Sequence, residues 1–91
     1  DAYSEKQFMT YVEDVLQANS SSMVIDLSNI DFLDSSGLGA LVQTAKKCNQ
    51  GKRSFCIVGN ARVVQTIKLV RLEEFLHLSP DLSTALSKLA A

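Results

Sequence analysis

No run of apolar residues in this 91-residue chain is longer than four positions, far below the roughly 20 that a membrane-spanning helix needs. An excess of one charge is also lacking, because nine Lys and Arg residues are scattered among ten Asp and Glu. Neither nucleic acid nor an anionic membrane surface is therefore an expected partner. No basic and apolar leader opens the chain, so a cytoplasmic location is expected.

Cysteine and histidine are scarce. Cys48 and Cys56 do not form a CxxC pair, and a disulfide scaffold of this length normally has four or more cysteines. Both are therefore expected to be reduced and buried, as free cysteines commonly are. His77 is the one histidine, which leaves too few ligands for a metal site, and no cofactor of another kind is expected.

The length of the chain supports one hydrophobic core and not two. Folding at this size hides only roughly 60–65% of the surface of the unfolded chain, which leaves little room for a deep cavity. We therefore expect a compact binding or switching module and not an enzyme.

Apolar periodicity predicts an α/β fold, a small sheet with helices packed on it. A capping box at 4–7 predicts a first helix containing Phe8, Tyr11, Val12, Val15 and Leu16. Strands are predicted at 23–27, which should be largely buried, at 54–58 and at 75–78. Further helices are predicted from Leu38 to about Gly51, on Val63, Val64, Ile67 and Val70, and from Leu82 to Leu89 after a Ser79-Pro80 cap. Because strands and helices alternate, the strands should be parallel.

The densest polar cluster of the chain is Asp34-Ser35-Ser36-Gly37-Leu38-Gly39, where a loop enters a helix. A helix N-terminus exposes free amides and a positive dipole end, which suit a phosphate group. A simpler alternative is that Asp34 or Ser35 caps the helix, while the two glycines allow close packing. The cluster is neither a GxSxG nucleophile elbow nor a Walker loop.

Residues 24–41, VIDLSNIDFLDSSGLGAL, closely resemble the STAS domain family of bacterial anti-sigma factor antagonists and their relatives. The family pattern is an apolar strand ending in an acidic residue, a short link with an apolar or aromatic residue, and Asp-Ser-Ser/Thr-Gly-Leu-Gly opening a helix. Weaker agreement extends over about residues 4–90. The resemblance implies a STAS-like fold for the whole chain.

In antagonists of this family a partner serine kinase phosphorylates the first Ser of the motif, which corresponds to Ser35, with Ser36 as the second choice. The resemblance implies a non-enzymatic partner switch that binds an anti-sigma factor serine kinase, is released by phosphorylation, and is reset by a phosphatase. The expected partner-binding residues are Asp26, Asp31, Asp34, Ser35, Ser36, Gly37, Gly39 and Gln43. Lys46 shares the outward helix face with the last two. For Asp26 and Asp31 the alternative is that they are only solvated acidic residues of the loop.

Family members normally begin with a pair of strands before the first helix. We therefore expect one STAS domain over residues 1–91 that lacks this strand pair. Because unpaired strand edges invite pairing, such a chain should be marginally stable, or be completed by another segment or by self-association through exchange between protomers. A basic cluster of Lys46, Lys47, Lys52 and Arg53 could be a docking patch, or could only complement a helix dipole.

Other functions remain open at this point. The domain could be a scaffold subunit of a stressosome or of a lipid ABC transporter complex, or the cytoplasmic STAS domain of an anion transporter. A nucleotide-binding or hydrolytic role is disfavoured, because no phosphate loop with a lysine occurs.

Overall fold

The computed structural model describes Asp14 and residues 22–90. The elements in chain order are β1 (Met23–Leu27), α2 (Ser35–Gln50), β2 (Phe55–Gly59), α3 (Ala61–Leu69), β3 (Leu78–Ser79) and α4 (Leu82–Ala90). The helix predicted after the capping box at 4–7 lies outside the described residues. The remaining predicted helices and the first two strands are present, but α2 begins at Ser35 and not at Leu38, and β2 covers 55–59 and not 54–58.

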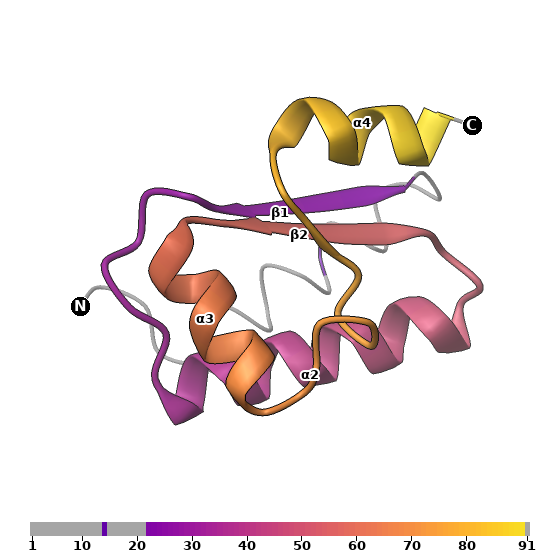
Figure 1. The fold of residues 1–91 in the computed structure, drawn as a ribbon. Coiled ribbons are helices and arrows are strands. Elements are labelled where there is room, and N and C mark those ends of the chain that lie inside the picture. The colour runs from indigo at the N-terminus through magenta and orange to yellow at the C-terminus, as the bar shows by residue number, and fades with distance from the viewer. Residues whose placement is uncertain (1–13, 15–21, 91) are drawn as a thin grey trace.

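The three strands form a parallel sheet in the order β1-β2-β3. Met23 is in register with Phe55, and Ile57 with Leu78. Helix α2 connects β1 to β2, and α3 leads from β2 towards β3, so the parallel crossovers expected from the alternation are present. Figure 1 shows α2 and α3 on one face of the sheet and α4 on the other.

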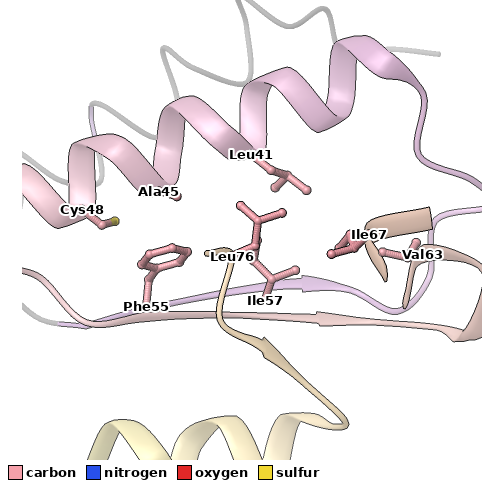
Figure 2. Packing of buried hydrophobic residues seen from close by; sticks show 8 residues of the cluster. All are labelled: Leu41, Ala45, Cys48, Phe55, Ile57, Val63, Ile67 and Leu76. Atoms are coloured by element: carbon pink, nitrogen blue, oxygen red, sulfur yellow. The ribbon is translucent and has the colours of Figure 1, made fainter. Parts of the chain in front are cut away.

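The core forms around β2, because the central strand is covered on both faces. Phe55 and Ile57 point towards α2 and α3, whereas Cys56 and Val58 point towards α4 and Ala85. The larger cluster, shown in Figure 2, consists of Leu41, Ala45, Cys48, Phe55, Ile57, Val63, Ile67 and Leu76. Both cysteines are free and buried, as predicted. Burial raises the pKa of the Cys48 thiol, which keeps it protonated.

The strand predicted at 75–78 is wrong for its first three residues. Residues 73–77 form turns, and β3 contains only Leu78 and Ser79. Leu76 donates its amide to the carbonyl of Leu72, and Leu78 donates to Glu73, so these backbone groups are satisfied locally. Leu76 is fully buried from this turn, which accounts for the apolar signal without a strand.

Three smaller expectations also need correction. Helix α4 is capped by Asp81, whose Oδ1 accepts the Thr84 amide at 2.7 Å, while Ser79 is a buried strand residue. Val70 lies at the C-cap of α3 and is 47% exposed, so it is not part of the buried helix face. Strand β1 is half-buried rather than largely buried, because it lies at one side of the described sheet.

Candidate functional site

The loop 28–34 carries the chain from the C-terminal end of β1 to the first turn of α2. Asp34 adopts extended backbone and caps the helix, since its Oδ1 accepts the Gly37 amide at 2.8 Å. Its carbonyl accepts the Leu38 amide at 2.9 Å. Of the two caps left open by the sequence, Asp34 is therefore the one used, and Ser35 is the first residue of the helix.

Ser35 and Ser36 are both exposed in the first turn of α2. Within residues 22–90 neither hydroxyl has a hydrogen-bond partner. The first amides of a helix point out of its end and give it a partial positive charge. A hydroxyl at this position is accessible to another protein, and a negative group placed on it would be favoured by the helix dipole.

The two acidic residues that precede the motif differ in their surroundings. Asp26, at the end of β1, accepts the Ser28 hydroxyl at 2.6 Å and the Ser28 amide at 3.0 Å. Both hydrogen bonds lower the pKa of Asp26, the one from the Ser28 hydroxyl more than the one from the Ser28 amide. Asp31 is exposed in the loop. Asp26 therefore shapes the start of the loop, whereas Asp31 faces solvent near the helix entry.

The outward face of α2 is accessible beyond its first turn. Gln43 and Lys46 are exposed, and Gly39 is half-buried. On the opposite side Leu41 is buried, while Leu38 and Val42 are half-buried and pack against the core, as their spacing predicted. Gly37 is half-buried, and a Cβ there would lie 2.8 Å from Leu33 Cδ1. Glycine at position 37 thus allows the first turn of α2 to lie close to the loop.

Phe32 is an exposed aromatic residue that the sequence analysis did not select. Its neighbours Ile30 and Leu33 pack against the core, which leaves Phe32 outside with 66% of its surface exposed. It lies three residues before Ser35. An exposed aromatic side chain is a common anchor of protein interfaces. Its position in the short link of the motif was visible in the sequence, but its exposure was not.

Asn60 is a second residue that the sequence reasoning did not place at the site. Its Oδ1 accepts the Val63 amide at 2.9 Å and so caps α3. Its Nδ2 donates to the carbonyls of Ile30 at 2.6 Å and Ser28 at 3.2 Å. The sequence indicated only that Gly59-Asn60 ends a strand, because a contact across 30 residues leaves no local signal.

The basic cluster and His77 lie away from this loop. Lys46, Lys47, Lys52 and Arg53 belong to the last turns of α2 and the turn after it, and the 16-residue helix is about 24 Å long. His77 stacks edge-on against Phe55, with ring centroids 4.8 Å apart. The described residues contain no group of three side chains able to hold a metal ion. Within the same part of the chain, no helix is long and apolar enough to cross a membrane.

Comparison with known proteins gives consistent matches. The family model of the STAS domain matches residues 1–85. The anti-sigma-B factor antagonist of Staphylococcus aureus strain NCTC 8325 / PS 47 is 25% identical over 80 residues, covering 87% of this chain and 74% of that protein. The protein of the same name from Staphylococcus epidermidis matches with the same identity and coverage.

Proposed function

The chain belongs to the STAS domain family, and we propose that it is an anti-sigma factor antagonist that binds an anti-sigma factor serine kinase and is released when Ser35 is phosphorylated. The relatives it matches are named as regulators and not as enzymes. The observation that carries the proposal is the exposed Ser35 hydroxyl at the start of a helix whose cap is already supplied by Asp34.

The proposed docking surface consists of the loop and the outer face of α2. It contains Phe32 and, from the motif and the helix, Asp31, Asp34, Ser35, Ser36, Gly37, Gly39 and Gln43. Asp26 supports this surface through the Ser28 turn. The surface joins one exposed aromatic residue to small and polar residues, a composition suited to a protein partner.

Phosphorylation would change the charge of this surface more than its shape. A phosphoserine adds about −1.5 to −2 charge units, and burying that charge in an interface is unfavourable unless a basic group meets it. Asp34 already places a carboxylate beside Ser35. The helix dipole favours the phosphate within the free domain, so the fold tolerates a modification that the interface does not. A phosphatase that removes the group would restore binding.

The proposal is tested by incubating the purified chain with Mg-ATP and each serine-kinase anti-sigma factor encoded in the same genome. Fragment mass analysis should place one phosphate on Ser35. The phosphate should be absent from Ser35→Ala and retained in Ser36→Ala. Because Asp34 provides the cap, neither substitution removes a hydrogen bond within the described residues.

Two outcomes would contradict the proposal. Phosphate found on Ser36 alone would show that Ser36, and not Ser35, is the phosphorylation site. Stable binding to these proteins without phosphorylation under any condition would instead indicate a permanent scaffold subunit, in which Ser35 is only an exposed helix residue.

A further inference from the structure

Asn60 joins two segments that are far apart in the sequence. It stands between β2 and α3, whereas the carbonyls that accept its Nδ2 belong to Ser28 and Ile30, 32 and 30 residues earlier. The same side chain caps α3 through Oδ1. A neutral amide suits this place because it offers donors and an acceptor in one group.

The junction between β2 and α3, which carries Asn60, is tightly packed. A Cβ on Gly59 would lie 2.6 Å from Cγ1 of Val63, a residue with no exposed surface. Glycine therefore allows the end of β2 to approach the first turn of α3 closely. Asn60 follows Gly59 directly, and its Oδ1 accepts the Val63 amide. The close packing before it and the hydrogen bond after it therefore fix its position.

Ile30 and Leu33 of the loop that Asn60 contacts pack against the core, and the other hydrogen bonds that hold its start, among the described residues, are short-range. Ser28 bonds to Asp26, and the Ile30 amide donates to the Leu27 carbonyl at 3.3 Å. These bonds shape the turn but do not attach it to a distant part of the fold. The two bonds from Asn60 do, and they act four to six residues before Asp34.

We propose that Asn60 is a positioning residue that fixes the loop 28–34, and thereby the direction in which Phe32 and Ser35 meet a protein partner. The inference rests on the proposed function and assigns one determinant of it. Asn60 is half-buried, so it acts through the loop and need not contact the partner. Productive encounter of a kinase with a serine depends on orientation, and a displacement of about 1 Å can reduce a rate by about a hundredfold.

Two substitutions separate the two tasks of Asn60. Asn60→Ser and Asn60→Asp both keep an oxygen that can cap α3, and both lack the amide N–H groups that hold Ser28 and Ile30. A matched control is Ile67→Val, which removes one buried methylene from α3 and leaves both hydrogen bonds from Asn60 to the loop in place. Thermal midpoints of all variants are measured first, so that rates are compared only where the chain is folded.

The readouts are amide hydrogen exchange across residues 28–34 and the rate of Ser35 phosphorylation by the kinase that modifies the unaltered chain. Both Asn60 variants should exchange faster in the loop and be phosphorylated about tenfold more slowly, and Ile67→Val should match the unaltered chain in both. If the Asn60 variants were less stable but were phosphorylated at the rate of the unaltered chain, the positioning role of Asn60 would be rejected and the proposed function would stand. If no kinase modified the unaltered chain, the proposed function would be rejected, and with it the positioning role of Asn60.

Discussion

Asp34 and Ser35 are adjacent residues with separable tasks. The carboxylate of Asp34 satisfies the Gly37 amide, whereas the hydroxyl of Ser35 makes no hydrogen bond within the described part of the chain. A residue whose hydroxyl also capped the helix would lose that bond on modification. Here the cap is made by Asp34 and not by the serine proposed to carry the phosphate, so charge can be added to Ser35 without breaking the hydrogen bond that caps α2.

This division predicts different effects of alanine at the two positions. Asp34→Ala should lower the free energy of unfolding by about 1 kcal/mol, the usual cost of losing an N-cap. Ser35→Ala should stay within about 0.5 kcal/mol of the unaltered chain, as exposed residues without special contacts do. Urea unfolding followed by circular dichroism measures both, and Asp34→Asn, which retains a capping oxygen, is the control. A larger loss for Ser35→Ala would show that Ser35 has a structural role.

The helix start at residues 34–39 could be predicted from the sequence, but the side chains that surround it in the fold could not. Residues 34–39 carry a local pattern, because capping residues and glycines must stand next to the helix they begin. The pattern did not decide whether Asp34 or Ser35 caps the helix, since either side chain can accept a hydrogen bond from a backbone amide. The exposure of Phe32 and the contacts of Asn60 depend on tertiary packing, which neighbouring residues in the sequence do not determine.

Among the elements, β1, α2, β2 and α3 were predicted from apolar spacing, whereas β3 was largely misplaced. Long periodic segments carry a strong signal, but a short segment such as 75–78, with three apolar residues among four, does not distinguish a strand from a buried turn. Leu76 is buried because the turn after α3 brings it to the core. Similarly, Ser79-Pro80 is a plausible cap by composition, yet the helix begins one residue after Asp81.

Helix α4 should respond to acid through that cap. Hydrogen bonds from the backbone amide and then the side chain of Thr84 lower the pKa of Asp81. A carboxyl whose pKa is depressed in the folded state stabilises the fold above its unfolded pKa, about 4, and loses this contribution as the pH falls through the folded value. The cap should therefore weaken below about pH 4, and α4, which covers one face of the sheet, should loosen.

Thermal midpoints at pH 6 and pH 3 test this expectation. Asp81→Asn keeps an oxygen for the Thr84 amide but cannot be protonated in this range, so its midpoint should fall less between the two values than that of the unaltered chain. Asp26 also has a lowered pKa, through Ser28, and contributes in the same direction in both proteins. Equal decreases for the two proteins would mean that the Asp81 cap does not account for acid sensitivity.

Over the whole molecule, Ser35 lies at the start of α2, whereas Lys47, Lys52 and Arg53 of the basic cluster lie at or just after its end, and Lys46 lies one turn beyond Gln43. The site lies where β1 ends and α2 begins, and residues 46–53 lie where α2 ends and β2 is entered. The parallel arrangement separates them, because α2 must return along the sheet before β2 starts. A phosphate on Ser35 would therefore remain distant from Lys47 and Arg53, and its charge would act mainly on whatever docks at the helix entry.

A phosphate mimic should consequently weaken binding without unfolding the domain. Ser35→Asp adds a negative charge at a helix N-terminus, where the dipole favours it, so the thermal midpoint should stay equal or rise slightly. Binding to the anti-sigma factor partner, measured by calorimetry, should weaken about tenfold or more, which corresponds to about 1.4 kcal/mol. Ser83→Asp is the matched control, because it adds the same charge to the exposed first turn of α4 on the other face of the sheet. If Ser83→Asp weakened binding equally, the cause would be net charge, and a lowered midpoint for Ser35→Asp would instead point to a disturbed fold.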